Sequence, residues 1–302
     1  MPRPPQRFQI AVLGAGRIGS ACAFQLARTG GHDVTVIARP GSVRLAQLQR
    51  DNAIVDIKGE RADVRVVDRL DEAAPYDLLI VTLLAHQAAP LLPALQRSKA
   101  SCIQFMCNTF TPERLQAAIG AERCAFGMPF VQSNLDGDGR LKATIGAGGQ
   151  KTLLSQSRWV DAFIAAGLPA TLESDMTLWL RCHAPLCVAF ESVSVGGEQR
   201  GGGASWNDAL VLAHGVHAGF ALIRSLGHEV YPKMKTRLEG SPKWVVALML
   251  WSMSRVRSFR VLLATGEAEC GALIDAMVSA APSGAFAPAI AAMRPRSPIQ
   301  TS

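Results

Sequence analysis

The chain has 302 residues, of which 49% are hydrophobic and 18% are charged. This length and balance predict two globular domains and exclude an intrinsically disordered protein. The net charge is +7, but no dense basic run and few aromatic residues accompany it, so nucleic acid is not an expected partner. The seven cysteines form no C-x-x-C pair, which favours free thiols and a cytoplasmic location. No apolar stretch reaches the roughly 18 residues of a membrane span.

The segment from Phe8 to Gly41 has the pattern of a strand, a glycine-rich turn, a helix and a second strand. Residues 14–19 fit G-x-G-x-x-G. In this pattern the first glycine forms a tight turn, the second lets the backbone approach a pyrophosphate, and the third lets the helix pack closely on the strand. The helix N-terminus favours the same phosphates. The expected cofactor-binding residues of the turn are Gly14, Ala15, Gly16, Arg17, Ile18 and Gly19. A purely structural turn is the alternative.

Arg39 stands at the end of the second strand, after Ala38. Proteins that bind NAD(H) usually place an aspartate or glutamate there, which bonds to the ribose hydroxyl groups. An arginine suits the additional phosphate of NADP(H) instead. The sequence therefore predicts NADP(H) as the cofactor, with a solvated surface arginine as the alternative.

Residues 1–172 alternate strands and helices, which predicts a Rossmann-type, doubly wound parallel sheet. The expected strands span residues 10–13, 34–38, 53–57, 63–67, 76–82, 101–106, 124–130 and 141–146. The expected helices span residues 18–29, 43–49 and 87–97, and another opens at Pro112 with Thr111 as its N-cap. Ligands bind such sheets at the carboxyl ends of the strands. We therefore expect Leu83 and Asn108 beside the glycine turn, although Asn108 alone would suit an ordinary turn.

Residues 173–302 predict an all-helical second domain, with a cleft between it and the first. The expected helices span residues 176–192, 206–226, 243–261 and 270–281, and a glycine-rich break covers residues 196–203. The predicted fold class is thus α/β, a nucleotide-binding domain followed by a helical substrate domain.

The glycine turn with Arg39 and three further segments resemble the ketopantoate reductase (2-dehydropantoate 2-reductase) family. Residues 81–87 resemble its V-T-L-K-A-x-Q segment, Asn108 falls within its Gln-Asn-Gly, and residues 175–181 resemble its D-I-x-x-x-W-x-K. The resemblance covers most of the chain but is loose after about Gly196. It implies an NADPH-dependent reductase of a small 2-oxo acid that acts in pantothenate biosynthesis, with a homodimer as the expected assembly.

The departures from the family pattern concern catalysis. The catalytic lysine falls on Arg181, a second lysine near the cofactor falls on Leu84, and an asparagine falls on Pro185. Arg181 could hold a carboxylate or carbonyl, but its pKa is too high for a proton donor. His183 titrates in the useful range and is the candidate acid. Two helical residues differ by about 200° in direction, so a packed histidine is the alternative.

Two C-terminal segments carry weaker resemblances. Residues 251–254 resemble the family's S-S-M segment, whose serine contacts the substrate, which implies Ser252. Residues 266–269 resemble its G-R-x-T-E, whose glutamate contacts the cofactor ribose, which implies Glu269, with Glu267 as an alternative. Solvated helix faces are the other interpretation. The resemblance also implies that Asn108 contacts both cofactor and substrate.

No other motif gives a competing chemistry. His214 and His217, and the group Cys182, His183 and Cys187, have residue types of metal sites but no neighbouring carboxylate, and no metal is expected. Two other functions stay open: an NADP(H)-binding sensor or partner protein without turnover, which the loss of the family lysine suggests, and a dehydrogenase acting on a different carbonyl or imine.

Overall fold

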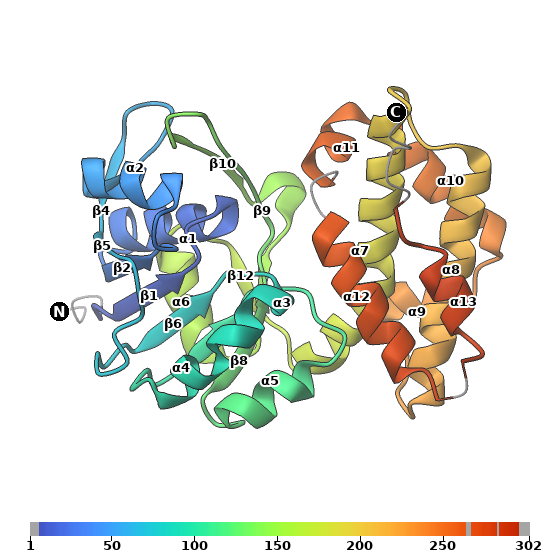
Figure 1. Ribbon diagram of the computed structural model, residues 1–302, viewed down its shortest axis with the longest axis horizontal. Helices are drawn as coiled ribbons and strands as arrows, with labels where there is room; N and C mark the ends of the chain where they lie inside the picture. Colours follow the sequence, from blue (N-terminus) through green and yellow to red (C-terminus); the bar gives the residue numbers. More distant parts are fainter. Residues whose placement is uncertain (1–5, 264–266, 283, 296–302) are drawn as a thin grey trace. The chain divides into compact units, whose positions relative to one another are not determined.

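The structure is a computed structural model that describes residues 6–263, 267–282 and 284–295 (Figure 1). The chain forms two compact units. The first consists of residues 1–107 and 113–176, and the second consists of residues 108–112 and 177–302. The short segment 108–112 therefore belongs to the second, helical unit, although the residues before and after it in the chain belong to the first unit.

The first unit contains an eight-stranded sheet with the order β12-β11-β8-β7-β6-β1-β2-β5. Its strands are β1 Gln9–Leu13, β2 Asp33–Ile37, β5 Arg65–Val67, β6 Leu78–Val81, β7 Ile103–Phe105, β8 Cys124–Met128, β11 Thr152–Leu154 and β12 Ala170–Leu172. Six strands are parallel, and β11 is antiparallel to β8. The chain leaves β1 in one direction and returns through β6 in the other, so the predicted doubly wound sheet is confirmed. Its topological switch point lies between β1 and β6.

Helices cover this sheet and explain its apolar strands. They are α1 Arg17–Arg28, α2 Val43–Asp51, α3 Ala85–Ala88, η1 Ala89–Leu91, α4 Leu92–Arg97, α5 Pro112–Ile119 and α6 Ser157–Ala165. Leu26 of α1, Trp159 and Phe163 of α6, and Ile10 and Val36 of the sheet share one buried core. Every residue of β6 is buried, as expected for a parallel strand covered on both faces.

Three details of the predicted first unit are wrong. The expected hairpin around Lys58 and Gly59 forms, but between β3 Ala53–Val55 and β4 Arg61–Asp63, so that only Asp63 of the predicted strand 63–67 takes part. The rest of that strand is β5, which joins the main sheet. Residues 141–146 do not continue that sheet either, because β10 Leu141–Ile145 pairs with β9 Val131–Leu135. The helix expected over 87–97 is interrupted, since Pro90 and Pro93 each lack the N–H that a continuous helix needs.

The second unit is helical, which confirms the predicted fold class. It contains α7 Met176–Gln199, α8 Trp206–Ser225, α9 Lys233–Glu239, α10 Lys243–Met253, α11 Arg257–Leu263, α12 Glu267–Ala280 and α13 Ala287–Ala291. A second buried core joins α7, α8, α10, α12 and α13. Pro185 stands inside α7. A Cβ built on Gly219 of α8 would lie 2.6 Å from its ring, so the two helices approach closely there.

Two helix boundaries differ from the prediction. The helix α7 continues through Gly196 and Gly197 to Gln199, so the break begins later than expected. The helix predicted over 243–261 is two helices, α10 and α11. The hydroxyl of Ser254 donates to the carbonyl of Trp251 at 2.7 Å and accepts from the backbone N–H of Ala204 at 3.0 Å. Such side-chain bonds compete with helix continuation.

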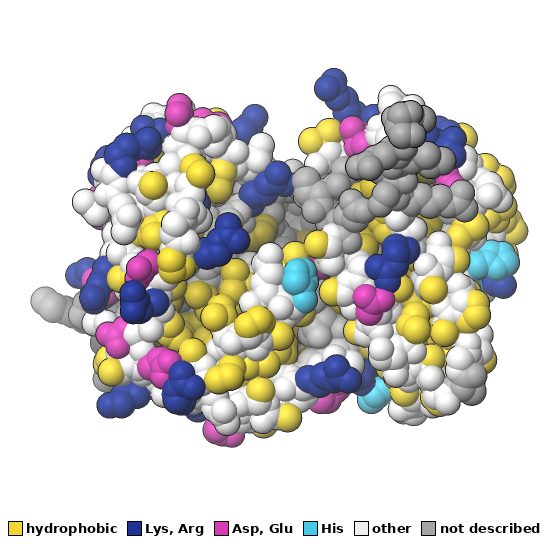
Figure 2. Space-filling view, in the orientation of Figure 1, with side chains coloured by type: hydrophobic (Ala, Val, Ile, Leu, Met, Phe, Trp, Pro, Cys, Tyr) yellow, Lys and Arg dark blue, Asp and Glu magenta, His cyan; other side chains and the backbone are white. Residues whose placement is uncertain are grey.

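The surface carries no concentrated charge on the face shown in Figure 2, where Lys and Arg side chains are dispersed among acidic and apolar ones. Within the described ranges, no helix is both long and apolar enough to cross a membrane.

Candidate active site

The glycine turn between β1 and α1 has the backbone geometry that its motif predicts. Gly14 has φ +108°, and its N–H donates to the carbonyl of Ile37 at 3.0 Å. A Cβ built on Gly19 would lie 1.8 Å from the carbonyl oxygen of Gly14, so only glycine fits there. A Cβ built on Gly16 would meet no protein atom within 4 Å. Protein atoms therefore fill the space beside Gly14 and Gly19, whereas the space beside Gly16 is open.

The turn is held in place by a side chain that sequence reasoning missed. Arg44 of α2 donates from Nε to the carbonyl of Ala15 at 3.3 Å, and from Nη2 to the hydroxyl of Ser20 at 3.0 Å. Its Nη1 donates to the carbonyl of Gly139 at 2.8 Å. Burial lowers the pKa of Arg44. This guanidinium faces carbonyl oxygens, and so it fixes the backbone of the turn.

The other residues predicted around the turn lie as follows. Arg17 is the exposed first residue of α1, whereas Ile18 packs partly against the core. Leu83 lies against the turn as expected, because a Cβ on Gly14 would meet its Cδ2 at 3.0 Å. Arg39 is exposed, and within the described ranges no carboxylate forms an ion pair with it.

This arrangement fits a dinucleotide. The open backbone at Gly16 leaves room for a pyrophosphate, and the N-terminus of α1 has no side-chain cap and no acidic residue in its first turn. The exposed cation of Arg39 follows β2, at the position where an adenosine ribose is recognised in such folds.

Asn108 and Glu269 were predicted from separate segments, and the structure brings them together in the second unit. The Nδ2 of Asn108 donates to Oε1 of Glu269 at 2.9 Å. The Oδ1 of Asn108 is buried and has no hydrogen-bond partner among the described residues. Buried polar atoms are rarely left unpaired in native proteins. That oxygen is therefore a candidate acceptor for a donor group on a ligand.

A buried acid that sequence reasoning did not identify lies near Glu269. Glu191 of α7 is only 6% exposed. The thiols of Cys270 and Cys187 donate to Glu191 at 3.0 and 3.5 Å. Burial, followed by the negative charge of Glu269, raises the pKa of Glu191 to about 8. A carboxylate within a mostly apolar run of α7 was the signal in the sequence.

Arg181, which stands in the position of the family lysine, is buried within the second unit. Its Nε donates to the carbonyl of Phe110 at 3.3 Å, and its Nη1 contacts Nε2 of His228. Its guanidinium also lies 5.8 Å from the centre of the Phe110 ring. The side chain thus ties α7 to the segment that carries Asn108.

The expectation that His183 titrates near neutral pH is wrong. Its ring stacks on Trp179, with 4.5 Å between the ring centres. Burial, together with the charge of Lys235, lowers the pKa of His183 to about 3. Lys235 is itself buried, donates to the carbonyl of Trp179 at 3.0 Å and lies over the Trp179 ring. His183 is therefore neutral at physiological pH, and its remaining ring N–H is too weak an acid for the role that was expected of it.

The remaining candidates lie on or near the helix surfaces. Ser252 is exposed on α10, while Ser254 is the buried serine of the same segment. The side chain of Glu267 lies outside the described residues. Both ring nitrogens of His217 lie 2.9 Å from backbone carbonyls, those of Ala213 and Ser241. Over the described ranges, no three His, Cys, Asp or Glu side chains are grouped so that they could hold a metal ion.

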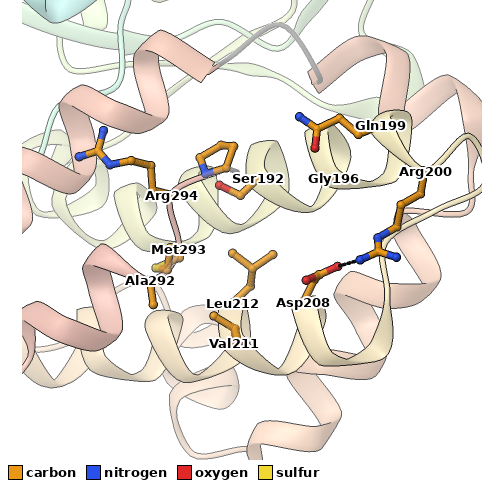
Figure 3. A pocket seen from close by; sticks show the side chains of 11 residues that line it. Ser192, Gly196, Gln199, Arg200, Asp208, Val211, Leu212, Ala292, Met293 and Arg294 are labelled. Carbon is orange, nitrogen blue, oxygen red and sulfur yellow. Dashed lines mark ion pairs between the residues drawn. The ribbon is translucent and has the colours of Figure 1, made fainter. Parts of the chain in front are cut away.

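A pocket of the second unit lies between α7, α8 and the residues after α13 (Figure 3). Its two cations are both engaged: Arg200 pairs with Asp208 at 3.3 Å, and Arg294 pairs with Asp275. These pairs neutralise the charge that could attract an acidic ligand. Ser192 forms part of its wall and lies 3.7 Å from the thiol of Cys270, so the pocket adjoins the carboxyl and thiol group described above.

The structure thus defines a two-domain protein with a Rossmann-type sheet and a helical C-terminal unit. Residues 10–157 match the family model described as Ketopantoate reductase PanE/ApbA. This match places residues 10–157 in that family, and the two-domain fold of the whole chain is shared with a solved member of the family. Two curated relatives named 2-dehydropantoate 2-reductase are each 31% identical, over 85 residues in Mesorhizobium japonicum and 103 in Bacillus subtilis. These matches cover 28% and 33% of this chain, and 26% and 33% of the relatives' own lengths.

The solved structures agree on the fold. A PanE/ApbA family ketopantoate reductase from Ralstonia eutropha JMP134 has a TM-score of 0.70 at 17% identity, and the match covers 94% of this chain and 95% of that one. A D-mandelate dehydrogenase solved with NADH has a TM-score of 0.63 at 16% identity, and the match covers 94% and 97%. At these identities the likeness establishes the fold alone.

Proposed function

We propose that this protein is an NADPH-dependent reductase of a 2-oxo acid, of the ketopantoate reductase type. The observation that carries the proposal is the glycine turn, open at Gly16, with Arg39 after β2. The curated relatives named 2-dehydropantoate 2-reductase support the substrate class. The D-mandelate dehydrogenase, which was also solved with NADH and anilino(oxo)acetate, supports it too. Because that enzyme was solved with NADH, the preference of this chain for NADPH over NADH is the first property to test.

The residues of the turn have distinct proposed roles. The backbone of residues 14–19 binds the pyrophosphate, Arg39 binds the 2′-phosphate, and Leu83 packs beside the turn. The cofactor supplies hydride to the keto carbon. In the second unit, Asn108, which donates to Glu269, contacts both the cofactor and the substrate. Glu269 contacts the cofactor ribose, and Ser252 contacts the substrate. Arg181 supplies positive charge near the substrate oxygen or carboxylate.

Cofactor titration by fluorescence tests the nucleotide part of this proposal. Wild-type protein should bind NADPH more tightly than NADH, because only Arg39 pairs with the extra phosphate. Arg39→Ala should lose that preference and leave the affinity for NADH nearly unchanged. Arg114→Ala, which removes an exposed arginine of α5, is the matched control and should keep the preference. Equal affinity of the wild type for both cofactors would remove the role given to Arg39.

Turnover with a panel of 2-oxo acids, ketopantoate included, tests the reaction. The proposal predicts NADPH oxidation that depends on at least one member of the panel. If no 2-oxo acid supports NADPH consumption, the reductase proposal is wrong.

A second candidate function is an NADP(H)-binding protein without turnover. The observation that favours it is Arg181, which replaces the family lysine and is engaged with Phe110 and His228. Arg181→Lys separates the two functions. A large gain in ketopantoate reduction would show that the native site has lost this activity. A loss of native activity with any 2-oxo acid would show that Arg181 takes part in it.

A further inference from the structure

Arg44 of α2 connects the glycine turn to a hairpin that lies far away in sequence. Its Nε donates to the carbonyl of Ala15 at 3.3 Å, and its Nη2 donates to the hydroxyl of Ser20 at 3.0 Å. That hydroxyl is buried and donates in turn to the carbonyl of Ala15, also at 3.0 Å. The remaining nitrogen, Nη1, donates at 2.8 Å to the carbonyl of Gly139, in the turn between β9 and β10. One guanidinium group therefore holds both the glycine turn and the tip of this hairpin.

Side chains of α2 hold the tip of the β9–β10 hairpin at three consecutive carbonyls. Gln47 and Arg50 donate to the two carbonyls that precede that of Gly139, at 3.0 and 3.4 Å. Arg44, Gln47 and Arg50 are spaced three residues apart, which places them at neighbouring positions of one helix surface. Gly139 has φ +80°, and a Cβ built there would lie 2.6 Å from Nη1 of Arg44. The hairpin therefore approaches α2 closely and fixes the position of the Arg44 guanidinium.

The bond to Ala15 also orients the next backbone donor. The carbonyl of Ala15 and the N–H of Gly16 belong to one planar trans peptide group, in which they point in opposite directions. Holding the carbonyl towards Arg44 therefore directs the N–H of Gly16 away from Arg44. Gly16 is the residue beside which the turn is open. Arg44 thus fixes a donor of the turn before a ligand arrives, which reduces the ordering cost of binding.

The charge of Arg44 has no carboxylate partner, because within the described ranges no ion pair includes it. The acceptors of its guanidinium are two backbone carbonyls and a hydroxyl, which are all neutral. The side chain is partly buried, and burial lowers its pKa, an effect that the charge of Asp51 opposes. Solvent and salt screen a partly buried cation less than an exposed one. The glycine turn, which this cation contacts, therefore favours an anionic group.

We propose that Arg44 is a positioning residue for the pyrophosphate of the nicotinamide cofactor. The inference rests on the proposed function, in which that pyrophosphate binds the backbone of residues 14–19. Arg44 orients the peptide group between Ala15 and Gly16 and adds positive charge beside it. The pyrophosphate is common to NADPH and NADH. Arg44 therefore sets the affinity for both cofactors, whereas Arg39 sets the preference between them.

Fluorescence titration of Arg44→Met with NADPH and NADH tests this role in the full-length protein. Methionine fills part of the same space but has no charge and no N–H to donate. The affinity for both cofactors should fall by one common factor, about 10- to 100-fold, as expected for the loss of charge-assisted hydrogen bonds. The preference for NADPH over NADH should stay that of the wild type. Arg44→Lys, which keeps the charge but not all three hydrogen bonds, should lose less affinity, again equally for both cofactors.

Two comparisons separate this role from a general loss of structure. Arg50→Met is the matched control, because Arg50 contacts the same hairpin tip but not the glycine turn, and it should bind both cofactors as the wild type does. Adenosine 2′-monophosphate, which carries the 2′-phosphate but no pyrophosphate, is the second probe. Its affinity, measured by calorimetry, should be unchanged in Arg44→Met and reduced in Arg39→Ala.

Unchanged NADPH binding by Arg44→Met, or equal losses of affinity for NADPH and for adenosine 2′-monophosphate, would overturn the role given to Arg44. If Arg44→Met does not fold, Arg44→Lys decides by the same criteria. A wild type that binds neither dinucleotide would instead refute the nucleotide site of the proposed function, and the role of Arg44 with it. These readouts are affinities, so the test of Arg44 does not depend on whether a 2-oxo acid is reduced.

Discussion

Two glycines of the turn have different surroundings at the scale of single atoms. Gly19 faces the carbonyl of Gly14 and the hydroxyl of Thr82, whereas Gly16 faces open space. The space beside Gly19 is therefore filled by the protein itself, whereas the space beside Gly16 is open to a ligand. Substituting each glycine by alanine therefore separates folding from cofactor binding.

Gly16→Ala should fold with an unchanged melting temperature and bind NADPH at least 10-fold more weakly, because its methyl group would occupy the approach to the pyrophosphate. Gly19→Ala should destabilise the protein by about 2–3 kcal/mol or more, because its methyl group would overlap backbone atoms. Thermal denaturation and fluorescence titration of both variants check this. Normal NADPH binding by Gly16→Ala would contradict the account of the turn.

His183 gives a prediction about protonation. Burial lowers its pKa to about 3, below the ordinary value near 6.5. Its ring proton signals in an NMR titration should stay constant from pH 5 to pH 8. Because the unfolded chain takes up that proton below about pH 6.5 and the folded chain does not, His183 makes the protein less stable as pH falls. His86, whose side chain is exposed, serves as the reference in the same titration. A midpoint near pH 6.5 for His183 would contradict the structure.

At the scale of elements, the contact between α7 and α8 depends on a proline and a glycine. The ring of Pro185 lies where a Cβ of Gly219 would be, 2.6 Å from its Cγ and 2.8 Å from its Cβ. A proline ring cannot rotate away as a long side chain could. The two helices therefore need a residue without a side chain at position 219.

Gly219→Ala should lower the free energy of unfolding by about 1–3 kcal/mol. Gly196→Ala, within α7, is the matched control, because a Cβ there meets no atom within 4 Å beyond its own helix. It should be neutral or stabilise by up to about 1 kcal/mol through helix propensity. Urea denaturation of both variants measures the difference, and equal stabilities would argue against the close approach of α7 and α8.

The elements that could be predicted from sequence are those with a strong local signal. The buried run of β6, the turn after β1 and the start of α5 at Pro112 all follow from local chemistry. Strand pairing is not local. The pattern of residues 141–146 indicates a strand but does not show that it pairs with β9. The end of α10 also depends on a distant partner, the backbone N–H of Ala204.

At the scale of the whole molecule, the site has one part that lies within a continuous segment and another that combines distant segments. Only the first part could be predicted from the sequence. The glycine turn lies within one continuous segment, so its geometry was predictable. The group around Glu191 combines α7, α12 and the segment that carries Asn108. A resemblance supplied Asn108 and Glu269 separately, but only the fold joins them. Arg44, which fixes the turn from α2, had no sequence signal beyond its charge.

Hydride transfer from NADPH to a 2-oxo acid is the step on which the proposed function depends. Incubation with NADPH that carries deuterium at the transferable position, followed by mass spectrometry of the products, tests it most directly. The account predicts a 2-hydroxy acid that contains one deuterium from at least one member of a panel that includes ketopantoate. Products without deuterium, or no 2-hydroxy acid from any member of the panel, would contradict it.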